Sequence, residues 1–263
     1  MVKLKFLVIF FLLAGCTNNI KYNVKPGNEA FMLGNNSEIG VLMAHGFEAS
    51  PHELLGLAQF LASNNITVYV IRLNGHGTDI RELDNSKWQE WYKDYEIAYN
   101  ELSNKTRKVY VAGHSLGGAL ALYLAEQKET AGVISLATPT GLQDRMAEYA
   151  WLMKYFKKYE ARNISEDEKN YYYDNYSVAG VAQLVEVIHA YKEDLSKITE
   201  PILVMQLGNE TLIDPNSATY IYNNVKSKNK DIVIISGKGH GLLNGKYKDK
   251  VYEDVYDFVT SVK

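Results

Sequence analysis

The sequence predicts an α/β domain in which a mostly parallel sheet is flanked by helices and carries a small helical cap. Three observations lead to this fold class. Short apolar runs rich in β-branched residues alternate with segments of helical periodicity, a pattern typical of repeated βαβ units. One interval of about sixty residues breaks the alternation. The chain has 263 residues, which is long enough for one sizeable buried core.

Six apolar runs are the predicted strands. Most are apolar throughout rather than alternating in polarity, which indicates burial on both faces of a parallel sheet. Helices are predicted where apolar side chains recur at three- and four-residue spacing, as in residues 88–102 and 251–262. The predicted strands cover residues 39–44, 66–73, 108–113, 132–137, 202–207 and 231–236.

The interval between residues 138 and 201 contains no convincing strand. It shows only helical stretches, such as residues 145–159 and 181–195. An independent domain usually needs a longer chain to bury a core of its own. We therefore expect a small helical cap, inserted at about residues 140–198 between two strands of the sheet.

The N-terminus is expected to be an export signal rather than part of the fold. Lys3 and Lys5 precede an apolar run over residues 6–14, and a basic start followed by a short apolar stretch is the layout of such a signal. The run is too short to span a bilayer comfortably. Cys16 comes shortly after it, in an arrangement that resembles the bacterial lipobox, where the cysteine thiol is acylated.

We therefore expect residues 1–15 to be a lipoprotein signal peptide and a lipid on Cys16 to anchor the exported protein to a bacterial membrane of the cell envelope. Residues 16–36, rich in Asn, Lys and Gly, are predicted to be a flexible tether, and residues 37–263 the folded domain. The alternative is an ordinary secretory signal with a chance cysteine. Cys16 is the only cysteine in the sequence, so the mature domain has no internal disulfide and no cysteine-based metal site.

Composition narrows the possible partners. The formal net charge is -3, so no basic excess points to nucleic acid or to anionic lipid headgroups. The six histidines are scattered and lack ligand spacing beside carboxylates, so we expect no metal, and no cofactor is expected either.

The strongest chemical signal is the segment Gly113-His114-Ser115-Leu116-Gly117-Gly118. It follows a predicted strand and precedes a predicted helix, which is the context of a nucleophile elbow. The turn is so tight that the positions two before and two after the serine must lack bulk. The segment therefore predicts that Ser115 is a nucleophile held above the sheet at a helix N-terminus, where the helix dipole favours negative charge.

A serine hydroxyl needs a base to take its proton, and in folds with this elbow the base is a histidine late in the chain. Only His189 and His240 follow Ser115. His240 comes directly after the last predicted strand, in a glycine-rich loop that can place an imidazole over the elbow. His189 lies on a predicted helix of the cap, so His240 is the expected base.

The third member of such a triad is an acid that orients the imidazole. It should follow the strand predicted over residues 202–207, where Glu210 and Asp214 compete. Asp214 immediately precedes a proline and is well placed to cap the next helix. Glu210 is the favoured acid, because it lies near the point where the loop leaves the sheet, and Asp214 stays open as the alternative.

An oxyanion hole is expected from two backbone amides. In folds with a nucleophile elbow, one amide follows the nucleophile and the other comes from the loop after the first strong strand. These amides belong to Leu116 and Phe47. For Phe47 the competing interpretation is packing of its side chain, which is compatible with a role for its amide.

With these residues identified, the sequence resembles the small bacterial carboxylesterases of the monoacylglycerol-lipase-like group in the α/β-hydrolase superfamily. The resemblance extends from Gly40 to the C-terminus and implies the α/β-hydrolase fold, a short helical cap and cleavage of short- to medium-chain acyl esters. It also implies that the family's catalytic aspartate is replaced by Glu210. The segments that carry it are His45-Gly46-Phe47, Gly75-His76-Gly77, the elbow, residues 206–218 and residues 252–256.

The predicted function is therefore a serine carboxylesterase whose partner is a small-molecule ester, monoacylglycerols included. One alternative keeps the nucleophile and changes the substrate, giving a thioesterase or a deacetylase that acts on acylated sugars. Another is a non-catalytic binding lipoprotein on a decayed hydrolase fold. The aromatic residues of the cap are expected either to line an acyl pocket or to pack in the core; they are Tyr149, Trp151, Tyr155 and Phe156.

Overall fold

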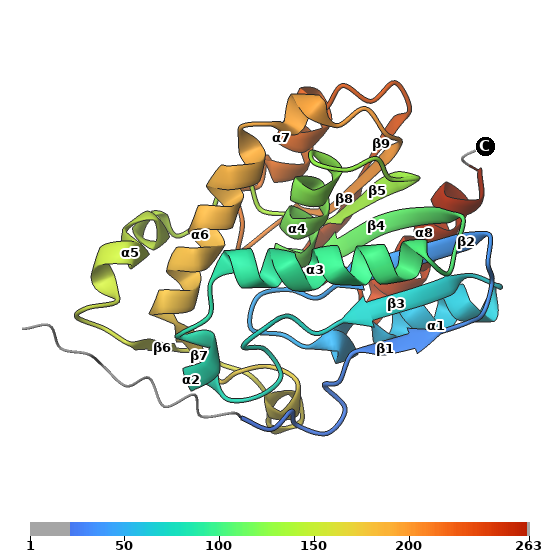
Figure 1. The fold of residues 1–263 in the computed structure, drawn as a ribbon. Coiled ribbons are helices and arrows are strands. Elements are labelled where there is room, and N and C mark those ends of the chain that lie inside the picture. The colour runs from blue at the N-terminus through green and yellow to red at the C-terminus, as the bar shows by residue number, and fades with distance from the viewer. Residues whose placement is uncertain (1–21, 262–263) are drawn as a thin grey trace, which may run out of the picture.

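The computed structural model describes residues 22–261. A seven-stranded sheet runs through the domain in the order β1-β3-β2-β4-β5-β8-β9, and all neighbouring strands are parallel except the pair β1 and β3 (Figure 1). The strands are β1 Phe31–Leu33, β2 Ile39–Ala44, β3 Thr67–Ile71, β4 Lys108–His114, β5 Gly132–Leu136, β8 Ile202–Asn209 and β9 Lys230–Lys238.

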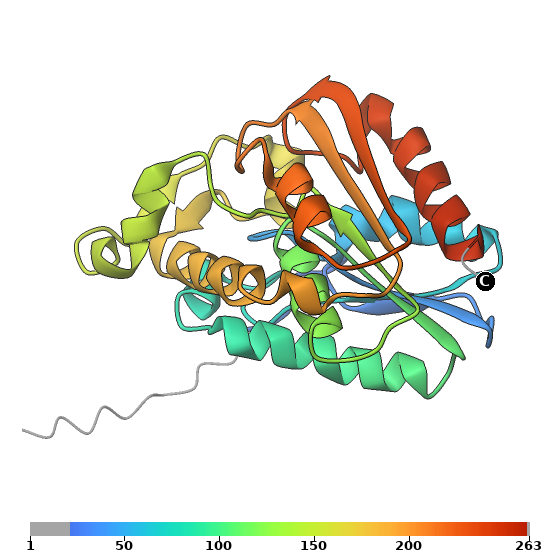
Figure 2. The same cartoon turned by 90° about the horizontal axis from the view of Figure 1, so that it is seen from above.

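Helices cover both faces of this sheet (Figure 2). One buried layer joins the sheet to α3, α4, α6 and α7, and a second joins it to α1 and α8. The α/β prediction is confirmed: every predicted strand exists, with ends within two residues of those expected for most. The helices are α1 Leu55–Ser63, α2 Ile80–Leu83, α3 Trp88–Ser103, α4 Leu116–Ala125, α5 Ala150–Met153, α6 Val178–Lys192, α7 Ser217–Asn224 and α8 Lys248–Ser261.

The segment predicted to be a tether contains structure at its C-terminal end. Strand β1 pairs antiparallel with β3, Phe31 opposite Val70 and Leu33 opposite Val68, so the folded domain begins before residue 37. The three-residue strand lies at the sheet edge and is only partly buried. A strand this short carries too little hydrophobic pattern to be recognised in a polar, asparagine-rich segment.

The cap between β5 and β8 contains more than helices. Besides α5 and α6, it has two short strands, β6 Tyr159–Ala161 and β7 Asn175–Ser177, which pair antiparallel. The stretch expected to be helical over residues 145–159 is a 3-10 turn, Arg145–Tyr149, followed by the single turn α5 and then β6. The cap lies at the end of the sheet opposite the C-terminus (Figure 1).

The expected signal peptide and Cys16 lie outside the described residues. Within residues 22–261, no helix has both the length and the apolar character needed to cross a membrane.

Close backbone packing surrounds the turn between β4 and α4. A Cβ atom at Gly113 would lie 2.0 Å from the carbonyl carbon of Gly117, and one at Gly117 would lie 1.9 Å from the carbonyl oxygen of Ala44 on the adjacent strand. One at Gly118 would meet the Thr138 hydroxyl at 1.9 Å. Glycine is therefore required at these positions because the chain and its neighbours occupy the space a side chain would need.

Replacing Gly117 by alanine is expected to lower the free energy of unfolding by about 3 kcal/mol or more, because backbone atoms cannot yield as a flexible side chain can. Gly208→Ala is the matched control, since its Cβ would make only ordinary contacts, 3.4 Å to Ile234. Thermal and urea unfolding measure both variants. Equal stability of the two would contradict the packing described for the turn.

Candidate active site

The register of the parallel strands brings the site residues to one edge of the sheet. Ala44 lies opposite Gly113 in the β2–β4 pair, so Phe47 and Ser115 follow neighbouring strand ends. Asn209 lies opposite Lys238 in the β8–β9 pair, which places the loops that carry Glu210 and His240 side by side. A β-bulge between Leu207 and Asn209 sets the end of β8. The four segments therefore converge at the carboxyl ends of adjacent strands.

Ser115 occupies a strained backbone position at the N-terminus of α4. Its φ of 53° and ψ of -114° lie in a region that non-glycine residues rarely adopt. The turn is held in part by the Ser115 N–H, which donates to the Leu136 carbonyl at 2.8 Å. The side chain lines a cavity, although the residue is only 8% exposed. This is the geometry of a nucleophile elbow.

His240 and Glu210 form a hydrogen-bonded pair. The His240 Nδ1 lies 3.0 Å from Glu210 Oε2, so this nitrogen carries the proton that it donates to the carboxylate. Glu210 is buried, and its Oε1 accepts from the N–H groups of Thr211 at 2.7 Å and Leu212 at 2.9 Å. With Nδ1 engaged, Nε2 is the imidazole nitrogen left to act as a base.

The pKa values of this pair suit an ionised acid beside a neutral base. Burial alone would raise the pKa of Glu210, but the hydrogen bond from His240 and the two backbone N–H groups hold it below its usual value. Burial lowers the pKa of His240, and the nearby His114 lowers it further, against the opposing effect of Glu210. At neutral pH the imidazole is therefore predominantly free to accept a proton.

The structure separates the two carboxylates that competed in the sequence. Asp214 accepts from the N–H of Asn216 at 2.8 Å, in the turn before α7. The N-cap residue of α7 is Asn216, without a side-chain capping hydrogen bond, so Asp214 does not cap the helix as expected. His189 lies on α6, half exposed, with Nε2 3.2 Å from Glu148 Oε2. Neither residue lines the cavity that contains Ser115.

Two backbone amides at the site have no hydrogen-bond acceptor within residues 22–261. They belong to Phe47 and Leu116, the pair expected to form an oxyanion hole. Leu116 is the first residue of α4, so its amide points out of the helix end where no intrahelical acceptor exists. Both amides are therefore available to an oxygen atom that bears developing negative charge.

A second buried acid–histidine pair, which the sequence analysis missed, lies between the loop that carries Phe47 and the loop that carries His240. His114 Nδ1 lies 3.2 Å from Glu53 Oε2, and the same oxygen accepts from the Gly46 N–H at 2.7 Å. On the other side, His114 Nε2 lies 3.2 Å from the His240 carbonyl oxygen, which accepts when this nitrogen carries hydrogen. The pair therefore connects the loop before Phe47 to the loop that carries His240.

The pKa values of the second pair shift in opposite directions. Burial would raise the pKa of Glu53, but attraction to His114 and the Gly46 N–H lower it to about 2. Burial would lower the pKa of His114, and Glu53 outweighs this effect and raises it. Glu53 lies on the 3-10 turn Pro51–Leu54, far in sequence from its partner, so no local pattern indicates the pairing.

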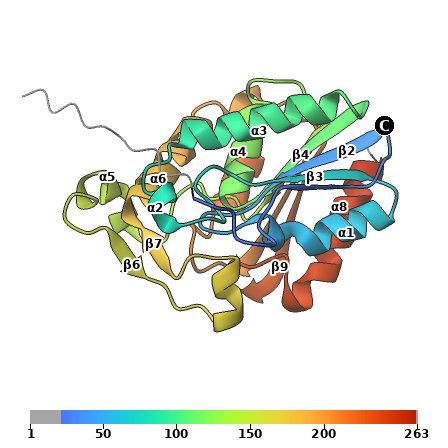
Figure 3. The ribbon, with the colours of Figure 1, turned by 60° about the horizontal axis from the view of Figure 1, so that its bottom comes forward.

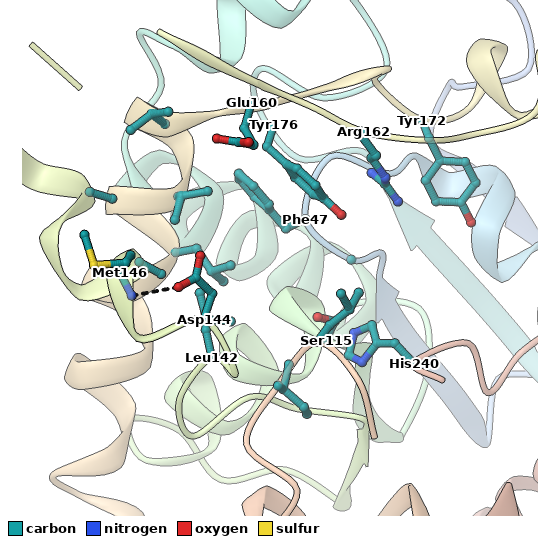
Figure 4. Close-up of a pocket in the computed structure, with 18 of the residues that line it drawn as sticks. Phe47, Ser115, Leu142, Asp144, Met146, Glu160, Arg162, Tyr172, Tyr176 and His240 are labelled. Atoms are coloured by element: carbon teal, nitrogen blue, oxygen red, sulfur yellow. Dashed lines mark hydrogen bonds between the residues drawn. The ribbon is translucent and has the colours of Figure 1, made fainter. Parts of the chain in front are cut away.

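A cavity of about 320 Å³ opens above Ser115 and His240, a volume within the usual range for small-molecule sites. Its two ends differ in chemistry. Mostly apolar side chains of the cap and of the loop after β8, with the carboxylate of Asp144 among them, line one end, while Arg162, Tyr172 and Tyr176 line the other. Figure 4 shows Leu142 and Met146 on one side of Ser115 and Arg162 and Tyr172 on the other.

The aromatic cap residues considered for an acyl pocket do not line this cavity. Tyr149 and Trp151 are each 57% exposed, Tyr155 is 75% exposed and Phe156 is 85% exposed. They also do not pack in a core, so both alternatives expected from the sequence are wrong. The cap instead contributes small or flexible apolar side chains to the cavity: Met146, Ala147, Ala150, Met153, Val178, Val181 and Leu184.

Within residues 22–261, no group of three or more histidine, cysteine, aspartate or glutamate side chains is placed to hold a metal ion.

Comparison with known sequences places these residues in a wider context. A family described as "Serine aminopeptidase, S33" matches residues 36–246. A thermostable monoacylglycerol lipase from Bacillus sp. (strain H-257) is 28% identical over 224 residues, which cover 84% of this chain and 89% of the lipase. A carboxylesterase from Bacillus subtilis (strain 168) is 25% identical over 226 residues, 83% of this chain and 91% of the esterase.

Solved structures show the same fold. A structure reported for LipS and LipT, two metagenome-derived lipolytic enzymes, superposes with a TM-score of 0.85 at 24% identity, covering 91% of this chain and all of that chain. The monoacylglycerol lipase of Paleococcus ferrophilus superposes with a TM-score of 0.76 at 16% identity, covering 89% of this chain and 98% of that one.

Proposed function

The chain belongs to the serine aminopeptidase S33 family of α/β-hydrolases, with lipase and carboxylesterase relatives, and we propose that it is a serine carboxylesterase acting through an acyl-enzyme on Ser115. One observation carries the proposal. Ser115 and His240 line the same cavity, and His240 is hydrogen-bonded to the buried carboxylate of Glu210.

The reaction proceeds in two stages. His240 Nε2 takes the Ser115 hydroxyl proton as Oγ attacks the ester carbonyl, while the amides of Phe47 and Leu116 hold the resulting oxyanion. Collapse of the tetrahedral intermediate releases the alcohol, which receives the proton from His240. Water, deprotonated by His240, then attacks the acyl-enzyme and returns Ser115 and the free carboxylic acid.

The two ends of the cavity support an acyl ester of short to medium chain length. The apolar end, formed by residues such as Leu142, Ala150 and Met153, receives the acyl chain, because apolar surface gains free energy when it leaves water. The polar end near Arg162 and Tyr172 receives the alcohol. Monoacylglycerols have this division, and an activity on them is named for one of the relatives.

We also propose that the protein is exported and held at a bacterial membrane by a lipid on Cys16. The support is the sequence alone: a basic start, a short apolar run and a single cysteine two positions after its end. Loss of membrane association in a Cys16→Ser variant of the full chain, measured by cell fractionation, is the corresponding test.

The acid is tested by two matched variants. Glu210→Gln should lower kcat by about 10³- to 10⁴-fold, because the imidazole loses its orientation and its stabilising charge. Asp214→Asn should change kcat by less than about threefold, because that carboxylate accepts from the Asn216 N–H in the turn before α7 and does not line the cavity. Turnover of p-nitrophenyl butyrate measures both, and Ser115→Ala provides the baseline.

A fluorophosphonate probe gives an independent measurement, since it should label Ser115 in the folded protein. Failure to label it would favour a non-catalytic binding protein. Loss of turnover in Asp214→Asn alone would make our assignment of the acid wrong. Preference for acyl-CoA or acylated sugars over simple esters would instead retain the nucleophile and change the substrate class.

The pH profile tests the coupling between the two histidines. Neutral His240 is the active base, so kcat/KM should rise with pH through its lowered pKa. The rings of His114 and His240 are 5.0 Å apart, and the positive charge of His114 lowers the pKa of His240. His114→Gln removes that charge and should therefore move the acid limb of the profile to higher pH.

His189→Gln is the control for this shift, because His189 lies on the cap and is half exposed. Its acid limb should coincide with that of the unaltered protein. An acid limb that stays in place, or moves to lower pH, in His114→Gln would contradict the electrostatic coupling.

Acyl-chain length is set by the apolar end of the cavity. Ala150 is buried and lines it, so Ala150→Phe should shorten the longest chain accepted. We expect kcat/KM for p-nitrophenyl dodecanoate to fall at least about tenfold, with that for the acetate nearly unchanged. Ala179→Phe on the outer side of α6 is the control, because Ala179 lines a separate groove. An unchanged chain-length profile in Ala150→Phe would place the acyl chain elsewhere.

A further inference from the structure

We propose that the outer face of the cap is a lipid-docking surface, which inserts into the interface of a membrane and places the mouth of the cavity against it. The surface is the aromatic patch, a run of exposed apolar side chains on the Arg145–Tyr149 turn, α5 and the segment that follows. Six of the ten large hydrophobic side chains that are exposed within residues 22–261 belong to it: Met146, Tyr149, Trp151, Leu152, Tyr155 and Phe156.

The composition of the aromatic patch fits a membrane interface. Phe156 is 85% exposed and Tyr155 is 75% exposed, and such exposure in water is unfavourable unless a partner covers it. Tryptophan and tyrosine are the residues enriched at the headgroup level of bilayers. The patch is also contiguous in sequence, so one short segment can enter the interface without unfolding the cap.

Lysines surround the aromatic patch. Lys154 lies over the ring of Tyr155 at 5.5 Å and has no ion pair within the described chain. Lys157 pairs with Glu160, and Lys158 pairs with Asp84 at 3.2 Å. Of these three lysines, Lys154 is therefore the one left to meet a lipid headgroup, and the apolar side chains supply most of the binding free energy.

The segment that carries the aromatic patch also lines the cavity with its inner side. Met146 is 55% exposed and also lines the cavity above Ser115, so it connects the two surfaces. Ala150 and Met153 line the cavity from within, one helical turn or less from the exposed Trp151. A lipid that leaves a membrane against the aromatic patch therefore has a short apolar path to the site.

The chain enters the domain beside the cap. Asn28 Nδ2 donates to the Asn170 carbonyl at 2.6 Å, and Asn170 Nδ2 donates to the Pro26 carbonyl at 3.0 Å. Further toward the N-terminus, the Arg81 guanidinium lies 5.1 Å from the ring centre of Tyr22. Arg81 lines the same surface groove as Tyr155 and Phe156. Figure 3 shows α2, which carries Arg81, and α5 at the same end of the molecule.

The length of chain before Tyr22 decides which face can meet a membrane. Cys16 is six positions before Tyr22, and six residues reach at most about 20 Å. This step rests on the proposed lipid at Cys16. An anchor at that distance holds the cap end of the domain near the bilayer, and the patch and the anchor together provide the two signals that stable attachment requires.

The test uses the chain from Thr17 to Lys263, which keeps every described residue and carries no lipid. Co-sedimentation with vesicles of phosphatidylglycerol and phosphatidylethanolamine measures binding. Trp151→Ser combined with Phe156→Ser should weaken partitioning by about tenfold or more. The control combines Ile97→Ser with Ile234→Ser, exposed apolar side chains on α3 and β9 away from the patch (53% and 50% exposed), and should bind as the unaltered chain does.

Two further measurements separate docking from catalysis and from self-association. Ser115→Ala should bind vesicles normally, so a failure of the proposed esterase activity would leave this result unchanged. Turnover of a water-soluble acetate ester should be the same in the patch and control variants. The proposal is overturned if the unaltered chain does not bind vesicles or if the patch variant binds equally well. It is also overturned if sedimentation velocity shows a dimer that only the patch variant dissolves.

Discussion

The close approach of backbone to backbone at the turn after β4 is the constraint on which the rest of the site depends. The backbones of Gly113 and Gly117 lie so close together that a Cβ atom on Gly113 would overlap the carbonyl carbon of Gly117. Gly117 in turn lies against the carbonyl of Ala44. Ser115, between these two glycines, has a positive φ of 53°, and the approach to Ala44 places the elbow beside the loop that follows β2. An elbow serine and a free amide at Phe47 are therefore consequences of one packing arrangement.

Buried charge at the site is organised as two acid–histidine pairs rather than one. Burial of an isolated carboxylate is costly, and in each pair a histidine beside the buried carboxylate reduces that cost. Glu210 orients His240, while Glu53 and His114 join the Phe47 loop to the His240 loop. Because like charges on neighbouring histidines disfavour each other, the positive charge on His114 helps keep His240 neutral.

The cap combines two surfaces in a short segment. Its inner side forms the apolar end of the cavity, and its outer side carries the aromatic patch. The cap is also joined to the loop that follows β2, because Glu48, directly after Phe47, accepts from the Ser177 N–H at 2.6 Å. Burial raises the pKa of Glu48 to about 8. The loop that bears the Phe47 amide is therefore tied directly to the cap.

The sequence by itself determined the strands of the parallel sheet, the elbow around Ser115 and the order of its potential partners, because these depend on local periodicity and on fixed spacing along the chain. Only the tertiary structure decided which carboxylate meets His240, since Glu210 and Asp214 are four positions apart and differ in whether the loop turns toward β9 or toward α7. It also decided the Glu53–His114 pair, the edge strand β1 and the outward direction of the cap aromatics. These depend on contacts between segments distant in sequence, or on strands too short to carry a pattern, and neither leaves a periodic signal in the chain.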